Sequence, residues 1–273
     1  MFRRKATRSK TAGSNHSNDK KSAANQYNRG LSLQEEGQWQ QALDCFNAVL
    51  NQQPPLAAAE QALALSARGQ SHLHLGNPQA AMADFDHALK LNPKDGGVLN
   101  NRGTIWLRLG EITKAIEDLN RAVKLSPKDP LPWNSRGSAR LRAGNLEQAL
   151  EDFDRAIRLD KNYATALSNR GTVLMRLNRT TEAMADYDRA IRAEPDYAAA
   201  YVNRGSAHQH LGHLEQAVAD FTRALRHDPN LAPALVGRAQ CYRLMGKKAE
   251  AMADREAALK LGQVRQVKVP PKS

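Results

Sequence analysis

Arginine recurs along the chain at a spacing that could build repeated ion pairs. The triplet Asn-Arg-Gly stands at residues 28–30, 101–103, 169–171 and 203–205. Six arginines at intervals of 34 residues are each followed, sixteen residues later, by an aspartate. The pairs are Arg68 and Asp84, Arg102 and Asp118, Arg136 and Asp152, Arg170 and Asp186, Arg204 and Asp220, and Arg238 and Asp254. A planar guanidinium can donate two parallel hydrogen bonds to a carboxylate, so the pattern predicts repeated bidentate ion pairs.

The spacing assigns these arginines to the structural frame rather than to a ligand. A turn residue lies midway between the partners, as Gly110 does between Arg102 and Asp118. In an antiparallel pair of helices, residues equidistant from the turn lie side by side. Each arginine also shares a helix face with apolar residues three before and four after it. We therefore expect charge-paired links within or between hairpins, with Arg29 held least firmly because Cys45 replaces the aspartate.

A second group of polar residues has a spacing that favours binding. An asparagine precedes several of the arginines, a hydroxyl residue follows three positions later, and an arginine or histidine comes four positions after that. Steps of three and four residues place these columns on one stripe of a helix, away from its core face. The candidates are Asn101, Asn169, Asn203, Thr104, Ser138, Thr172, Ser206, Arg108, Arg142, Arg176, His74 and His210.

The remaining reactive side chains do not form a catalytic or metal-binding pattern. His72 and His74 recur as His208 and His210, but helical residues two apart point to different faces and chelate poorly. The carboxylates belong to repeat columns, and no Gly-rich phosphate loop or nucleophile and base pair stands apart from them. We therefore expect no catalytic residues, no metal site, no cofactor and no enzymatic activity.

The charge of the chain is concentrated at its two ends. Of the net +12, residues 1–28 contribute +6 and residues 260–273 contribute +4, which leaves +2 for the rest. Residues 1–22 are rich in Ser, Asn, Lys and Arg and are predicted to be a disordered basic arm. That arm could be a solvated tail, a contact for nucleic acid or an anionic surface, or a mitochondrial presequence.

The cysteines and the hydropathy bear on the cellular location of the protein. Cys45 and Cys241 are far apart and have no metal-ligand spacing, so they indicate neither a disulfide framework nor a zinc site. No apolar run approaches the ~20 residues of a membrane span. The sequence predicts a cytoplasmic protein without a transmembrane segment; mitochondrial targeting by the N-terminal segment is the alternative.

The whole chain repeats every 34 residues. A glycine stands at Gly69, Gly103, Gly137, Gly171 and Gly205, and alanine, large apolar and proline columns keep the same interval. Each repeat reads as two helices, with a second glycine between them and the proline ending the second helix. Between the first two repeats, five extra residues near Pro54 and Pro55 could lengthen a loop or add a helical turn.

These columns resemble the tetratricopeptide repeat (TPR) over about residues 23–262. The expected fold is all-α, a right-handed α-solenoid of about seven helix-turn-helix units. The units are expected at about 23–55, 62–95, 96–129, 130–163, 164–197, 198–231 and 232–262, with an insertion near 54–61 and a short basic tail at 263–273. In the last unit, Arg255 and Ala239 replace the aromatic and the glycine, which indicates a terminal repeat whose outer face meets water.

The resemblance to TPR proteins implies a concave groove, lined by the first helix of each pair, that binds an extended peptide of another protein. It implies that the polar stripe faces this groove and that its asparagines can bind a ligand's main chain. Arg108, Arg142 and Arg176 would form a positive row that prefers an acidic peptide. The expected function is a non-enzymatic scaffold or adaptor. The alternative is a nucleic-acid or anionic-surface binder acting through the basic tails, although the near-neutral repeats argue against nucleic acid.

Overall fold

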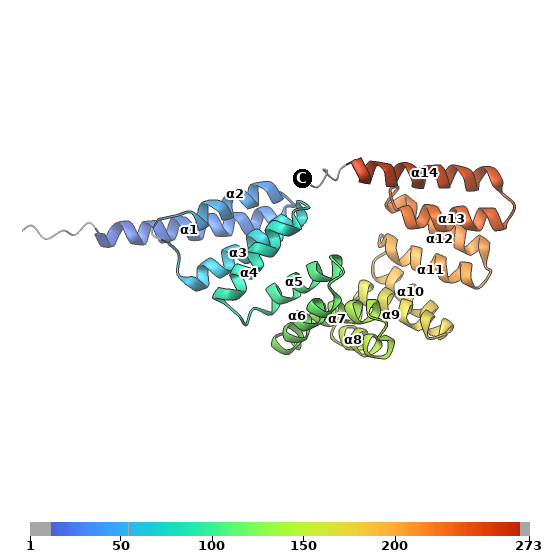
Figure 1. Ribbon diagram of the computed structural model, residues 1–273, viewed down its shortest axis with the longest axis horizontal. Coiled ribbons are helices and arrows are strands. Elements are labelled where there is room, and N and C mark those ends of the chain that lie inside the picture. Colours follow the sequence, from blue (N-terminus) through green and yellow to red (C-terminus); the bar gives the residue numbers. More distant parts are fainter. Residues whose placement is uncertain (1–11, 54, 268–273) are drawn as a thin grey trace, which may run out of the picture. The chain divides into compact units, whose positions relative to one another are not determined.

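The structure is a computed structural model that describes residues 12–53 and 55–267, with side chains described within 22–53 and 55–262. These residues form fourteen α-helices and no strand (Figure 1). The helices are α1 Ala12–Glu35, α2 Trp39–Leu50, α3 Ala58–His74, α4 Pro78–Leu91, α5 Gly96–Arg108, α6 Ile112–Leu125, α7 Pro130–Arg142, α8 Leu146–Leu159, α9 Ala164–Arg176, α10 Thr180–Ala193, α11 Ala198–His210, α12 Leu214–His227, α13 Ala232–Leu244 and α14 Lys248–Val267.

The helices pair into seven consecutive hairpins, from α1–α2 to α13–α14, and each hairpin packs on the next one within its compact unit. Helices α1 to α6 belong to a first compact unit, residues 1–127, and α7 to α14 to a second, residues 128–273. The expected all-α fold of seven helix-turn-helix repeats is confirmed.

The second glycine of each repeat turns the chain between the paired helices. Gly110, for example, has a φ of 82°, in the left-handed region that glycine enters at no steric cost. Its backbone N–H donates to Leu107 O, and the N–H of Glu111 donates to Trp106 O, so the last carbonyls of α5 are satisfied. In the fifth repeat the same place is taken by Asn178, with a φ of 58°. Asparagine tolerates this conformation better than other side chains do.

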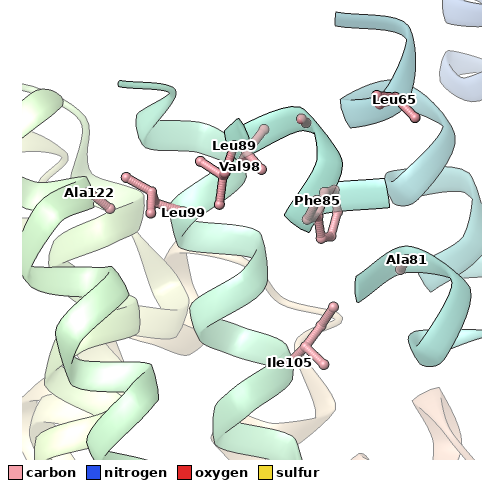
Figure 2. Close-up of a cluster of buried hydrophobic side chains, with 9 residues drawn as sticks. Leu65, Ala81, Phe85, Leu89, Val98, Leu99, Ile105 and Ala122 are labelled. Atoms are coloured by element: carbon pink, nitrogen blue, oxygen red, sulfur yellow. The ribbon is translucent and has the colours of Figure 1, made fainter. Parts of the chain in front are cut away.

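The first glycine of each repeat lets the paired helices approach one another. A Cβ atom added to Gly69 would lie 2.6 Å from the ring of Phe85, and one added to Gly171 would lie 2.6 Å from the ring of Tyr187. The aromatic side chain therefore fills the space that the missing side chain leaves. The core continues between neighbouring hairpins, where Leu65, Phe85, Leu89, Val98, Leu99 and Ile105 form one buried cluster (Figure 2).

The extra residues between the first two repeats change both a helix and the connection before it. Helix α3 has 17 residues, whereas α5, its counterpart in the next repeat, has 13, so α3 has an additional first turn. Helix α2 has 12 residues where α4 has 14, and the connection after α2 is longer, residues 51–57 compared with 92–95. Pro54 lies outside the described residues.

The ends of the array differ from the expected boundaries. Helix α1 begins at Ala12, so residues 12–22 are helical where a disordered arm was expected, and no proline interrupts this stretch. Residues 1–11 of that arm lie outside the described residues. Helix α14 continues to Val267, beyond the expected end of the repeats at 262, and residues 268–273 of the predicted tail also lie outside.

Candidate binding surface

The arginines beside the glycine column form the ion pairs that their spacing predicts. Nε and Nη2 of Arg170 donate to the two carboxylate oxygens of Asp186, each over 2.6 Å. The same two-pronged contact joins the two helices of five other hairpins. Its pairs are Arg68 and Asp84, Arg102 and Asp118, Arg136 and Asp152, Arg204 and Asp220, and Arg238 and Asp254. The prediction of structural arginines is confirmed.

A further contact of five of these arginines links a hairpin to the one before it within the same compact unit. Nη1 of Arg170 donates over 2.6 Å to Asp154, sixteen residues earlier on the preceding hairpin. The sequence reasoning did not identify this acceptor column. The repeated Asp-x-Asp motif could have indicated it. In three repeats the first aspartate of this motif binds the arginine of its own hairpin, and the second binds the arginine of the next hairpin. The acceptors found are Asn47 for Arg68, Asp86 for Arg102, Asp154 for Arg170, Asp188 for Arg204 and Thr222 for Arg238.

The electrostatics of several of these guanidinium groups agree with a structural role. The hydrogen bonds to Asp186 raise the pKa of Arg170 above its ordinary value, although burial acts in the opposite direction. Asp118 and Asp220 raise the pKa of Arg102 and Arg204 in the same way. Because each of the three guanidinium nitrogens of Arg170 already donates to a protein carboxylate, this arginine has less capacity left for a ligand.

Arg29 differs from the later arginines as predicted. Its side chain is exposed, and it forms no ion pair with any other described residue. Cys45, which stands where the aspartate is expected, is buried among the apolar residues of the first hairpin. The first repeat is the only one of the seven whose sequence lacks this aspartate.

In three repeats, the position four residues after the arginine carries histidine or a further arginine. Arg140 donates over 2.8 Å to Asp152, whereas Nε2 of His72 and of His208 lies 4.0 Å from Asp84 and Asp220. Burial lowers the pKa of both histidines, and their Nδ1 atoms are buried without a hydrogen-bond partner among the described residues. Nowhere in the described chain do three His, Cys, Asp or Glu residues gather as metal ligands.

The predicted asparagines take part in contacts between neighbouring first helices. Nδ2 of Asn169, on α9, donates to Oδ1 of Asn134 on α7 over 3.1 Å and approaches Oγ of Ser138 at 3.4 Å. Nδ2 of Asn203, on α11, donates to Oγ of Ser168 over 2.9 Å. These carboxamides therefore help to hold first helices together. Asn101, in the first compact unit, is half-buried on α5.

The predicted hydroxyl residues bond to their own helices. Each hydroxyl donates to a backbone carbonyl three or four residues earlier on its own helix. The bonds run from Thr104 to Asn101 O, Ser138 to Asn134 O, Thr172 to Ser168 O and Ser206 to Val202 O. This column is polar without carrying charge.

The predicted basic positions lie at the C-terminal ends of the first helices. In the second compact unit, Arg142, Arg176 and His210 are exposed at equivalent places on α7, α9 and α11, and these helices pack side by side. In the first compact unit, Arg108 is exposed at the end of α5. His74 instead stacks on Trp39, with ring centroids 3.6 Å apart and planes at 2°.

Models of the tetratricopeptide repeat match residues 27–95, 66–130 and 134–198, and a second model of the same repeat matches residues 170–240. The chain belongs to the TPR family. In general, the TPR fold is a scaffold for interaction between proteins, and its members are typically not catalysts. No curated protein sequence matches this TPR chain significantly. None of its described helices has the length and hydropathy to cross a membrane.

Solved structures support the same assignment. The chain is similar to a TPR protein from Parabacteroides merdae, with a TM-score of 0.70 and 21% identity, over 89% of this chain and 94% of the other. It is similar to the Thermus thermophilus TPR protein TTC0263, with a TM-score of 0.59 and 27% identity, over 66% of this chain and 98% of the other. It also resembles a chain of the APC/C hetero-tetramer Cut9–Hcn1, with a TM-score of 0.74 and 21% identity, over 85% of this chain and 45% of that one.

Proposed function

We propose that this TPR protein is a non-enzymatic adaptor that binds an acidic, extended segment of a partner protein along the first helices of its second compact unit. The observation that carries the proposal is the exposure of Arg142, Arg176 and His210 at one place on three adjoining helices. A guanidinium suits a carboxylate because its planar donors match two oxygen atoms. Arg108 offers the same chemistry on α5.

The neighbouring contacts indicate why recognition rests on the arginines. The Nδ2 groups of Asn169 and Asn203 already bind neighbouring helices, so these residues have fewer donors for a peptide main chain. The hydroxyl groups of Thr172 and Ser206 donate to their own helices and can only accept from a ligand. Positive charge is therefore the main attraction that the stripe offers, and it selects Asp and Glu side chains or a terminal carboxylate.

A peptide array tests this selection. Extended peptides that differ only in their number of Asp and Glu residues are probed with the intact protein and with an Arg108→Ala, Arg142→Ala, Arg176→Ala variant. The matched control is Arg158→Ala, Arg192→Ala, which removes exposed arginines one repeat apart from second helices. We expect the triple variant to lose most binding to acidic peptides and the control to retain it. Equal binding by both variants would refute the proposal, provided that circular dichroism shows both folded.

The basic N-terminal residues supply the competing explanation, and they can be separated from the first helices. Because α1 spans Ala12–Glu35, deleting residues 1–28 would cut into a helix. Substituting the seven Lys and Arg residues within 1–28 by Gln removes the charge and keeps the chain length. If binding to nucleic acid or anionic vesicles disappears in this variant and falls steeply with salt, the tails are the binding element.

A further inference from the structure

The last hairpin has an open apolar groove on its outer side. Helices α13 and α14 line this groove, which has a volume of about 750 Å³. Its largest apolar side chains are Val236, Met252 and Leu259, which are 56%, 63% and 59% exposed. Alanines 232, 239, 251 and 258 form much of the remaining wall. Monomeric proteins rarely leave such side chains together in water unless another surface covers them.

The preceding repeat shows what such a groove accepts. Val202, Val218 and Leu225 stand 34 residues before the three exposed side chains, and they pack into the buried cluster that contains Ala234 and Cys241 of α13. In that repeat the groove is thus covered by a helix of the next hairpin. The groove on α13 and α14 is therefore equivalent to the surface of α11 and α12 that packs against a helix of the next hairpin. We expect a helix to occupy it as well.

The charges of the groove define the chemistry of that helix. Arg243, Lys248 and Arg255 line the groove, and no acidic residue lines it. Arg255 holds the place that the buried Phe221 has one repeat earlier, so a positive charge replaces an aromatic ring. Asp254 is bound by Arg238 and does not neutralise these bases.

Two other occupants fit this surface poorly. The outer face of α1 carries exposed Asn25 and Ser32 at the positions of the buried Ala234 and Cys241, so a second copy would bring polar groups into the groove. Two copies joined through their last hairpins would place bases against bases. The segment after α14 contains Lys268 and Lys272 and no acid, so its charge also repels the groove.

We infer that the groove between α13 and α14 binds an amphipathic helix of another protein, with a stripe of apolar residues flanked by Asp or Glu. The apolar stripe covers Val236, Met252 and Leu259, and the flanking carboxylates meet Arg243, Lys248 and Arg255. This surface is separate from the first helices α7, α9 and α11, so the partner bound here is additional to the acidic segment proposed above.

Two designed peptides test the inference with the full chain. Both are helices of about 20 residues with Leu and Ala at steps of three and four. One carries Glu beside this stripe, and the other carries Lys at the same positions. We expect fluorescence anisotropy to show the Glu peptide bound at least about tenfold more tightly than the Lys peptide.

Matched variants locate the binding. Leu259→Asp should abolish it, whereas Leu211→Asp, an exposed leucine outside the groove, should not. Arg255→Glu should shift the preference toward the Lys peptide, whereas Arg226→Glu on α12 should leave it unchanged. Circular dichroism confirms that each variant is folded.

Several results would overturn the inference. If neither peptide binds, or if both bind equally well, an acidic helix is excluded as the occupant. Loss of the Glu peptide in the Arg142→Ala, Arg176→Ala variant would place it on the first helices. Sedimentation that shows self-association, reversed by Leu259→Asp, would make a second copy the occupant. Binding that appears only after removal of residues 268–273 would make the chain's own segment the occupant.

Discussion

The first hairpin, α1–α2, and the hairpin α9–α10 pack their helices alike but hold the repeated arginine differently. A Cβ atom on Gly30 would lie 2.6 Å from the ring of Phe46, just as one on Gly171 would from Tyr187. Yet Arg170 binds two aspartates, whereas Arg29 is exposed without an ion pair to any described residue. The difference teaches that close packing of glycine and aromatic ring suffices to form a hairpin. The ion pairs add a second layer that joins the two helices of the six later hairpins, and five of the arginines also contact the preceding hairpin.

Removal of a central aspartate should have the largest effect on this second layer. Asp152 is only 1% exposed and accepts hydrogen bonds from both Arg136 and Arg140. Asp152→Ala leaves two guanidinium groups without their acceptor, so we expect a loss of about 3–5 kcal/mol in the free energy of unfolding. Urea denaturation measures it, with Asp44→Ala in the first repeat as the control. An unchanged midpoint for Asp152→Ala would contradict the structural role of the column.

Exchange of glycine and alanine tests the first layer in two repeats. Gly171→Ala forces a methyl group against the ring of Tyr187, and we expect a loss of about 1–3 kcal/mol. Ala239 holds the same position in the last repeat, where Arg255 replaces the aromatic residue. There the reverse change, Ala239→Gly, should cost only about 0.5–1 kcal/mol, because glycine loses more backbone freedom. Thermal unfolding of both variants compares them, and a Gly171→Ala protein as stable as the parent would show that the ring yields.

Restoration of the missing aspartate should convert the first repeat to the later type. In Cys45→Asp the new carboxylate stands sixteen residues after Arg29, as in the other pairs. A double-mutant cycle with Arg29→Ala should yield a coupling of about 1 kcal/mol, compared with no coupling between Arg29 and Cys45 in the parent. A coupling free energy of zero would show that Arg29 on α1 does not reach the new carboxylate on α2.

The smallest expected effect concerns the histidines that stand where the fourth repeat has Arg140. Burial lowers the pKa of His208 below its ordinary value of 6.5, so the unfolded chain binds a proton more readily than the folded chain. The contribution of His208 to stability is therefore complete above pH 6.5 and is lost as the pH falls through the lowered folded-state pKa. In His208→Arg, an arginine can bind Asp220 as Arg140 binds Asp152, and this part of the pH dependence should vanish. Urea denaturation midpoints of the two proteins are compared between neutral and mildly acidic pH. If the midpoint changes equally with pH in both proteins, His208 does not contribute to the pH dependence of stability.

The sequence predicted the parts of this molecule that depend on periodic spacing. The 34-residue interval placed the second glycine of the repeats between the paired helices, and the sixteen-residue interval paired Arg170 with Asp186. Both predictions succeed because a hairpin fixes which residues face each other. The second acceptor, Asp154, was missed because it depends on how one hairpin packs on another.

The candidate surface was less predictable than the frame for the same physical reason. Helical spacing predicted a polar stripe that contains Arg142 and Arg176, and both side chains are exposed, but the spacing could not show that Nδ2 of Asn169 reaches Asn134 on a neighbouring helix. Nor could it show that His74 stacks on Trp39, since these residues belong to different hairpins. The ends of α1 and α14 were misplaced because polar helical stretches carry no periodic apolar signal there.

The double reach of the repeated arginine gives several 34-residue segments the same chemistry at their junctions. The segment of α9–α10, for example, brings its own donor in Arg170, an internal acceptor in Asp186, and a second acceptor, Asp188, for the segment that follows. Arg68 shows the tolerance of this arrangement, because it still reaches Asn47 although the insertion separates them by 21 residues instead of 16. A gene could therefore gain or lose a segment of this type and keep the same arginine contacts on both sides, which gives such a protein a simple route to change its length.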